Sequence, residues 1–353
     1  MLLVVTNEQS GLDIYSQEIA KRLDVKKITT RRYLSIAQAY KLARFIKGQG
    51  SIVHLPNQHF ARYALFLNQP FIVTAHDLVR CCFNFVPENM SEKIGLRLDT
   101  RYIKKASHII AISQTTKNDL VKYLNIPESR ISVIYNGVDH NIFKPHDVRL
   151  LDKPYILYVG SERPRKNLGR LFEAFATLRH NFPELKLVNV GSPGRSKQFR
   201  NDTVKKLSSL GITEDVIFVG HISELDLAYY YSSAALLAYP SLYEGFGLPP
   251  LEAMACGCPV VTSNTSSLPE VVGQAGIMVD PHDTDSLTQA MRQVLTDTEV
   301  RDNMIRKGLE QAMRFSWENT AKQTLEVYKM VGGAYGLGTI LQRKAALSGK
   351  VYQ

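Results

Sequence analysis

Short runs of apolar residues alternate along the chain with longer segments in which an apolar residue recurs every three or four positions. Runs such as 2–5, 71–75 and 154–160 predict buried strands, because a parallel strand covered on both faces is apolar along its length. The segments that follow, such as 13–23 and 168–180, predict amphipathic helices. The strand–helix order repeats through both halves of the chain and predicts an α/β fold with parallel sheets.

The repeat pauses once, across residues 144–154, after a turn signalled by Asn136-Gly137. A chain of 353 residues is long enough for two ordinary domains on either side of such a linker. We therefore expect four parts: a domain over 1–148, a second domain over 149–314, a helix over 315–331, and a basic tail with a glycine-rich start over 332–353.

The composition, 44% hydrophobic and 22% charged, is that of a globular protein. Four cysteines in a chain of this length indicate neither a disulfide framework nor a metal site, so we expect reduced thiols and a cytoplasmic protein. The start, MLLVVTNEQS, is interpreted as a strand and not as a leader peptide. No run approaches the roughly 18 apolar residues of a membrane span, so the expected location is cytoplasmic or peripheral at the inner face of a membrane.

Positive charge is concentrated near the N-terminus. Residues 21–47 hold nine Lys or Arg side chains against Asp24 alone, a local charge of +8 within a chain of net charge +10. No nucleic-acid-binding motif accompanies them, so we expect no nucleic acid partner. An anionic membrane surface is the favoured partner of 21–47, and a solvated basic face without a partner is the alternative.

The segment that follows the apolar run 234–238 has the features of an anion site. Gly245 and Gly247 permit a tight loop, and Pro249 and Pro250 suit a helix start. A glycine-bearing loop that leads into a helix N-terminus presents N–H groups and the positive end of the helix dipole.

Two carboxylates flank this loop, Glu244 before it and Glu252 in the helix that follows. They could accept hydrogen bonds from the hydroxyl groups of a sugar. The alternative for Glu252 is a first-turn glutamate that stabilises the helix dipole, and the alternative for Glu244 is an exposed loop residue.

Two further residues stand at strand ends. Lys166 lies between the strand 154–160 and a helix for which Asn167 is a plausible N-cap. A cation at this place would contact the same anion as the N–H groups of the helix start. His76 follows the strand 71–75 and would face the crevice beyond that strand, or it could be a hydrogen-bonded loop histidine.

The whole string from 241 to 271, SLYEGFGLPPLEAMACGCPVV followed by SSLPEV, resembles the signature of the GT4-type retaining glycosyltransferases, the glycosyl transferases group 1. Glu244 and Glu252 match the two glutamates of that signature, which are separated by seven residues. The resemblance implies a GT-B architecture: two Rossmann-like, doubly wound domains that face a cleft, with a C-terminal helix that crosses back to the first domain.

The resemblance also implies roles for individual residues. Lys166 would bind the donor phosphates, but Ser161 stands where many relatives carry an arginine, so Arg163 or Arg165 would supply the second positive charge. Glu244 would bind hydroxyl groups of the transferred sugar next to His76, and Lys166, Glu244 and His76 form the expected catalytic set. The remaining expected contacts of the sugar nucleotide are Gly11, Ile222, the N–H groups near Phe246, Gly247 and Leu248, and Glu252 at the ribose.

The implied activity is a metal-independent, retaining transfer of a hexose to a glycan or lipid-linked acceptor hydroxyl in surface-polysaccharide or glycoconjugate assembly. A mannose-like sugar is favoured, with GDP-mannose as the first expected donor and a UDP-hexose as the second, and no separate cofactor or metal is expected. Two alternatives use the same architecture: a non-hydrolysing sugar-nucleotide epimerase, and a catalytically silent sugar-nucleotide-binding protein.

Overall fold

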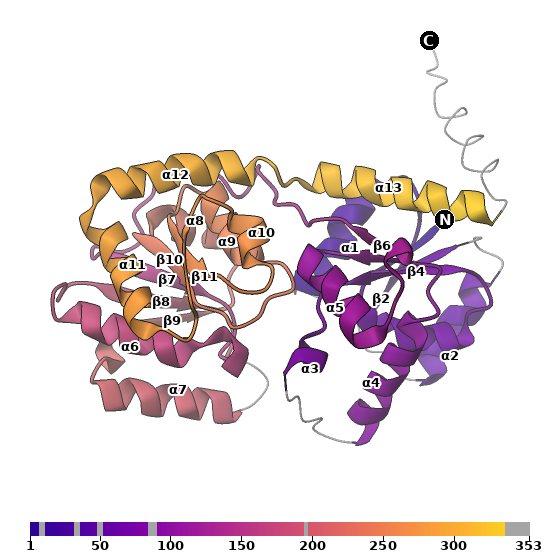
Figure 1. The fold of residues 1–353 in the computed structure, drawn as a ribbon, viewed down its shortest axis with the longest axis horizontal. Helices are drawn as coiled ribbons and strands as arrows, with labels where there is room; N and C mark the ends of the chain where they lie inside the picture. Colours follow the sequence, from indigo (N-terminus) through magenta and orange to yellow (C-terminus); the bar gives the residue numbers. More distant parts are fainter. Residues whose placement is uncertain (7–10, 32–35, 48–51, 84–89, 194–196, 336–353) are drawn as a thin grey trace, which may run out of the picture. The chain divides into compact units, whose positions relative to one another are not determined.

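A computed structural model of the protein describes residues 1–6, 11–31, 36–47, 52–83, 90–193 and 197–335 (Figure 1). Contacts divide the chain into two compact units, Met1–Gly137 together with Trp317–Gln353, and Val138–Ser316. Each unit contains one six-stranded sheet in which all neighbouring strands are parallel, so the expected α/β fold is confirmed.

The first unit has the strand order β2-β1-β3-β4-β5-β6. Its strands are β1 (Leu2–Thr6), β2 (Lys26–Thr30), β3 (Val53–Leu55), β4 (Phe71–Ala75), β5 (His108–Ala111) and β6 (Ile131–Val133). Its helices are α1 (Gly11–Arg22), α2 (Ile36–Ile46), η1 (Gln58–Phe66), α3 (Val79–Cys82), α4 (Met90–Ile103), α5 (Gln114–Leu124), η2 (Glu128–Arg130) and α13 (Trp317–Ala334).

Both faces of this sheet are covered by core, as the continuous apolar strands require. Leu2 and Val4 of β1 point into one buried cluster, while Leu3 and Val5 point into the other. β1 therefore contributes apolar side chains to the core on both faces of the sheet.

The last helix of the chain packs in the first unit. Trp317 of α13 meets Tyr15 of α1 edge-on at 6.3 Å, and the Tyr328 hydroxyl lies 2.6 Å from Nδ1 of His54. The helix continues past Val331 to Ala334, through the glycines at which we expected a linker to begin. Burial of Val331 and Gly332 explains the extension, because packing outweighs the low helix propensity of glycine.

The second unit has the strand order β12-β11-β10-β7-β8-β9. Its strands are β7 (Tyr155–Val159), β8 (Lys186–Val190), β9 (Val216–Gly220), β10 (Leu236–Tyr239), β11 (Val260–Ser263) and β12 (Ile277–Val279). Its helices are η3 (Pro164–Lys166), α6 (Leu168–Arg179), α7 (Lys197–Leu210), η4 (Thr213–Asp215), α8 (Glu224–Ser233), α9 (Leu248–Ala255), α10 (Leu268–Val272), α11 (Thr284–Thr296) and α12 (Thr298–Ala312).

The strand order of the second unit reverses beside β7. The chain builds outward from β7 through β8 to β9, then returns to place β10 on the other side of β7. The loops after β7 and β10 therefore leave the same edge of the sheet in opposite directions, and ligands of doubly wound folds bind at such a point.

Candidate functional site

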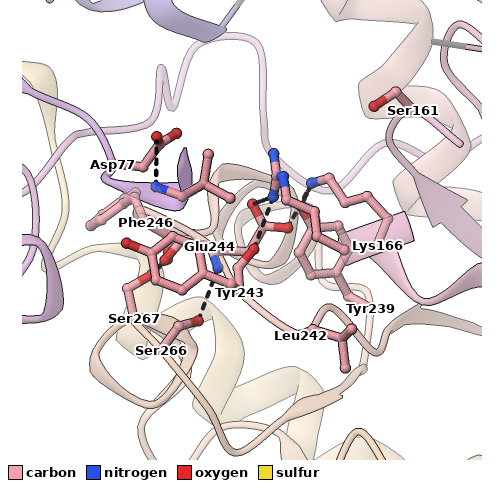
Figure 2. Close-up of polar contacts among 12 residues, drawn as sticks. Asp77, Ser161, Lys166, Tyr239, Leu242, Tyr243, Glu244, Phe246, Ser266 and Ser267 are labelled. Atoms are coloured by element: carbon pink, nitrogen blue, oxygen red, sulfur yellow. Dashed lines mark hydrogen bonds and ion pairs between the residues drawn. The ribbon is translucent and has the colours of Figure 1, made fainter. Parts of the chain in front are cut away.

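The loops after β7 and β10 bring two cations and one carboxylate together. The Lys166 ammonium lies 2.7 Å from Oε1 of Glu244, and the Arg165 guanidinium lies 3.0 Å from Oε2 of the same residue (Figure 2). Arg165 also donates to the carbonyl oxygen of Tyr243 at 2.9 Å. Lys166 and Glu244 are both buried, so this cluster forms a polar centre at the strand ends of the second unit.

A tyrosine that the sequence did not single out supports Lys166. Lys166 Nζ donates to the hydroxyl of Tyr239 at 2.5 Å and lies 4.8 Å from the centroid of the same ring. Tyr158 stacks on Tyr239 with the ring planes 22° apart, and its own hydroxyl donates to the carbonyl oxygen of Ser161. The lysine is therefore held between an aromatic platform from β7 and β10 and the carboxylate of Glu244.

The surroundings shift the pKa values of the pair. Burial lowers the pKa of Lys166 to about 8, although Glu244 opposes the shift. Burial disfavours the charge of Glu244, but Lys166 and Arg165 together outweigh burial and lower its pKa to about 2. Both groups are therefore charged at neutral pH.

An ammonium group has three donors, and Lys166 gives two of them to Glu244 and Tyr239. Among the described residues, the third donor has no hydrogen-bond partner.

Two serines from the loop before α10 hold the segment that contains Glu244. The N–H of Glu244 donates to Ser266 Oγ at 3.0 Å, while Ser267 Oγ donates to the carbonyl oxygens of Glu244 and Phe246 at 2.9 and 2.6 Å. Figure 2 shows the contact between Ser266 and Glu244 beside the Lys166 cluster. These hydrogen bonds connect two loops of the second unit and fix the backbone on which the carboxylate stands.

Two prolines limit the N–H donors in the first turn of α9. Pro249 and Pro250 occupy its first turn and carry no N–H, so only Gly247 and Leu248 can present N–H groups there. Gly247 has φ +120°, and a Cβ at this position would lie 3.0 Å from Cδ2 of Leu268. A glycine is thus required on both conformational and steric grounds. The Phe246 side chain does not face solvent, because it is buried edge-on against Phe315.

Glu252 occupies a different environment from Glu244. It lies past the first turn of α9, which contains no acidic residue, so the interpretation as a first-turn glutamate is wrong. Its carboxylate accepts a hydrogen bond from the Tyr231 hydroxyl at 2.9 Å, and burial raises its pKa to about 7. One glutamate of the motif is held ionised by cations, and the other titrates near neutrality.

The ends of β7, β8 and β9 lie close together beside this cluster. Gly160 donates to the carbonyl of Val190, and Gly191 donates to that of Gly220, both at 2.8 Å. A Cβ on Gly191 would lie 2.3 Å from the carbonyl oxygen of Gly160, so only glycine fits. Ile222 follows Gly220 with a half-buried side chain.

The residues after β7 differ in exposure. Ser161 is half-buried and Arg163 is exposed, whereas Arg165 shares Glu244 with Lys166. Asn167 stands at the N-cap position of α6 but makes no capping hydrogen bond. Its side-chain amide instead donates to the carbonyls of Pro240 and Pro281. The amide thus ties the Lys166 loop to the end of β10.

His76 and Gly11 belong to the first unit, whereas the other predicted site residues belong to the second unit. His76 is buried, with Nε2 donating to the carbonyl of Pro56 at 2.8 Å and its ring edge-on to Tyr15 at 5.3 Å. Burial lowers the pKa of His76 to about 4, so the imidazole is neutral at pH 7 and Nδ1 is its acceptor. Gly11 is the first residue of α1, and the loop before it, 7–10, is outside the described residues.

The described part of the chain contains neither a cluster of metal-ligating side chains nor a helix able to cross a membrane. Within it, no three His, Cys, Asp or Glu side chains are placed to hold a metal ion. No helix in that part is long and apolar enough to cross a membrane.

Comparison with known proteins gives two family matches. Residues 3–142 match the model described as Glycosyltransferase Family 4, and residues 141–311 match Glycosyl transferases group 1. An O-antigen chain mannosyltransferase B of Escherichia coli is 34% identical over 283 residues, which are 74% of this chain and 70% of that protein. A D-inositol 3-phosphate glycosyltransferase of a Nocardioides species is 34% identical over 264 residues, 69% of this chain and 57% of that protein.

The fold has close counterparts among solved structures. Sucrose-phosphate synthase from Thermosynechococcus elongatus superposes with a TM-score of 0.78 at 21% identity, covering 95% of this chain and 100% of that one. Anabaena HepE, solved with UDP-glucose, gives a TM-score of 0.78 at 18% identity, covering 94% and 100%. These likenesses confirm the GT-B fold.

Proposed function

This chain belongs to glycosyltransferase family 4, the glycosyl transferases group 1, and from that membership we propose that it transfers a hexose from a nucleoside diphosphate sugar to a hydroxyl of a glycan or lipid-linked acceptor. The observation that carries the proposal is the buried cluster of Lys166, Arg165 and Glu244 at the strand-order reversal of the second unit. A diphosphate needs cations, and a hexose needs carboxylate acceptors. This cluster supplies both within one site.

Lys166 and Arg165 would stabilise the leaving group. When the bond between the anomeric carbon and oxygen breaks, positive charge develops on the sugar and negative charge on the diphosphate. An ammonium that is fixed in place before the reaction lowers that barrier, typically by about 2.7–4 kcal/mol for one good donor. The N–H groups of Gly247 and Leu248 would add donors at the positive end of α9.

Ser161 stands where many relatives carry an arginine, and we assign the role of that arginine to Arg165 and not to Arg163. It already shares a carboxylate with Lys166, so an anion that displaces Glu244 from the cations would meet both charges. Arg163, by contrast, is exposed.

The two glutamates would divide the recognition of hydroxyl groups. A bound diphosphate would take over part of the pairing of Lys166 and Arg165 with Glu244. Glu244 would then accept hydrogen bonds from the hexose, and Glu252 would accept hydrogen bonds from the ribose. Glu252 as a whole residue is half-buried, and its Oε2 atom already accepts a hydrogen bond from the Tyr231 hydroxyl. His76 would contribute a neutral imidazole from the first unit, and Gly11 and Ile222 would contribute backbone contacts.

Retention of configuration and independence of metal are parts of the same proposal. The acceptor would attack from the side of the leaving group, with the diphosphate helping to remove the proton. Because the cations of the site neutralise the diphosphate, the chemistry needs no metal ion.

Mannose is the hexose that we favour, with GDP-mannose as donor and a UDP-hexose as the second candidate. Mannosyltransferases recur among the relatives, including a serotype-specific mannosyltransferase WbdA of Escherichia coli that is 33% identical over 63% of this chain and 29% of that protein. The O-antigen named for the first relative supports an acceptor in surface-polysaccharide assembly.

A donor screen tests the proposal. The purified protein is incubated with each nucleoside diphosphate hexose and a panel of glycan and lipid-linked acceptors, and release of nucleoside diphosphate is measured. We expect acceptor-dependent release from GDP-mannose. Epimer formation from a donor without any acceptor would favour a sugar-nucleotide epimerase, and tight donor binding without release across the panel would favour a silent binding protein.

A further inference from the structure

Tyr231 of α8 is a buried tyrosine whose hydroxyl contacts a residue of the candidate site. Its side chain is fully buried, and its hydroxyl donates to Oε2 of Glu252 at 2.9 Å. The hydrogen bond joins α8 to α9, two helices that are in contact. Within the part of the chain that the structure describes, the Glu252 carboxylate accepts no other hydrogen bond. Tyr231 is therefore the side chain that orients this carboxylate.

The ring of Tyr231 is itself held in place by the segment that precedes β7. Phe143 of that segment meets the ring at an angle of 62°, with the centroids 6.3 Å apart. Ser232, the next residue of α8, accepts a hydrogen bond from the N–H of His146 at 3.2 Å. The end of α8 is thus anchored on both sides of the hydroxyl-bearing residue. Tyr231→Phe keeps the ring that packs here and removes only the hydroxyl.

The groups around Glu252 supply neutral donors and negative charge. Burial raises the pKa of Glu252 to about 7, although the hydrogen bond from Tyr231 lowers it, and Glu224 at the start of α8 raises it further. Burial and Glu252 raise the pKa of Cys256 to about 12 and keep that of Tyr231 well above its ordinary value, so both stay protonated. No described cation forms an ion pair with Glu252. The Tyr231 hydroxyl therefore remains a donor throughout the range in which Glu252 ionises.

We propose that Tyr231 is a positioning residue for recognition of the donor ribose: its hydroxyl binds one oxygen of the Glu252 carboxylate and thereby orients that carboxylate toward the ribose hydroxyls. The assignment rests on the proposed function, from which it takes the role of Glu252. Tyr231 does not touch the ligand, since it is fully buried. It acts by stabilising an ionised acceptor, because a protonated carboxyl group carries a donor of its own and accepts hydrogen bonds from hydroxyls less well.

Binding of a nucleoside diphosphate to the full chain tests the proposal. GDP and UDP are titrated calorimetrically into the natural protein and into Tyr231→Phe between about pH 6 and pH 9, and whichever the natural protein binds more tightly is used. Loss of the hydroxyl should raise the pKa of Glu252 from about 7 to about 8. The loss of affinity should therefore be about eightfold greater near pH 6 than near pH 9. Lys166 is common to both proteins, so its own ionisation cancels in the ratio.

Two controls separate this role from a structural one. Tyr230→Phe removes the hydroxyl of the adjacent half-buried tyrosine, whose described contacts are with Tyr155, and should bind as the natural protein does at every pH. In a Glu252→Gln background, Tyr231→Phe should produce no change of affinity that varies with pH.

The outcomes distinguish the assignment of Tyr231 from the proposed function. A loss in Tyr231→Phe that is the same at every pH, or a pH-dependent loss that persists in the Glu252→Gln background, would overturn the role of Tyr231 alone. The natural protein should bind the dideoxyribose form of the same diphosphate about tenfold more weakly, and equal affinity for the two forms would overturn the contact of Glu252 with the ribose. Binding of neither GDP nor UDP by the natural protein would overturn the proposed function and this assignment together.

Discussion

The hydroxyl of Tyr239 offers the sharpest single-atom test of the site. It accepts a hydrogen bond from Lys166 Nζ at 2.5 Å in a fully buried position, and burial keeps its pKa well above that of a free tyrosine, so it remains a neutral phenol. Tyr239→Phe removes this acceptor while preserving the ring that lies 4.8 Å from the ammonium. The lost hydrogen bond stabilises the charged form of Lys166 more than the neutral form, so its loss should lower the pKa of Lys166.

The size of the effect follows from the lost hydrogen bond. A hydrogen bond to a charged group contributes about 1.5–3 kcal/mol, and 1.36 kcal/mol corresponds to about one pKa unit. The pKa of Lys166, about 8 in the natural protein, should therefore fall to between about 6 and 7. Because the proposed role needs the ammonium form, the rate should fall on the alkaline side of that pKa.

The assay is kcat/KM for donor turnover across pH, which reports the ionisation of the free enzyme. The natural protein should lose activity above a pH of about 8, and Tyr239→Phe should lose it above about 6 to 7 while approaching the natural rate in acid. Tyr158→Phe is the matched control, since that hydroxyl donates to Ser161 and not to Lys166. An alkaline limb that stays in place in Tyr239→Phe would refute the coupling of this hydroxyl to Lys166.

Three further predictions concern Glu252, Glu244 and Gly191. Glu252, with its pKa raised to about 7, should bind the donor ribose less well as pH falls through that value. The donor KM should rise in acid for the natural protein and be flat with pH for Glu252→Gln, and a parallel rise in both would count against the assignment. Glu244 has a folded pKa of about 2, below its ordinary 4.5, so its pairing stabilises the protein above pH 4.5 and is lost as pH falls toward 2. The natural protein should lose about 3 kcal/mol of unfolding free energy in that range that Glu244→Gln does not lose, as urea titrations at several pH values would show. Gly191→Ala, whose Cβ would lie 2.3 Å from the Gly160 carbonyl oxygen at φ +143°, should destabilise the protein by about 2–4 kcal/mol in the same assay, and a change within error would show that the strand ends can adjust.

Strands that are buried on both faces could be predicted from the sequence, and an edge strand could not. The run Phe71–Ala75 is apolar because both of its faces pack in core. β2, with the sequence KKITT, lies at the edge of its sheet with mostly exposed or half-buried side chains, so it has no apolar run to detect.

The residue types of the candidate site were predictable, but its pairings were not. The place of Lys166 after a parallel strand and the resemblance to the family signature predict that it shares a ligand with Glu244, and the structure places the two side chains 2.7 Å apart. That Arg165 shares the same carboxylate, and that Tyr239 supports the lysine, depends on two loops meeting across the neighbouring strands β7 and β10. Such contacts leave no local periodicity, because the partners are more than seventy positions apart in the chain.

The affinity of the second unit's site for a diphosphate tests the central claim most directly. Calorimetric titration of GDP into the full chain is compared with titration into Lys166→Ala and into Lys205→Ala, an exposed lysine of α7 in the same unit. If the Lys166 cluster binds the donor diphosphate, Lys166→Ala should weaken GDP binding about a hundredfold, Lys205→Ala should leave it unchanged, and guanosine without phosphates should not discriminate among the three proteins. Equal GDP affinity in the natural protein and Lys166→Ala, with the fold intact, would contradict the account.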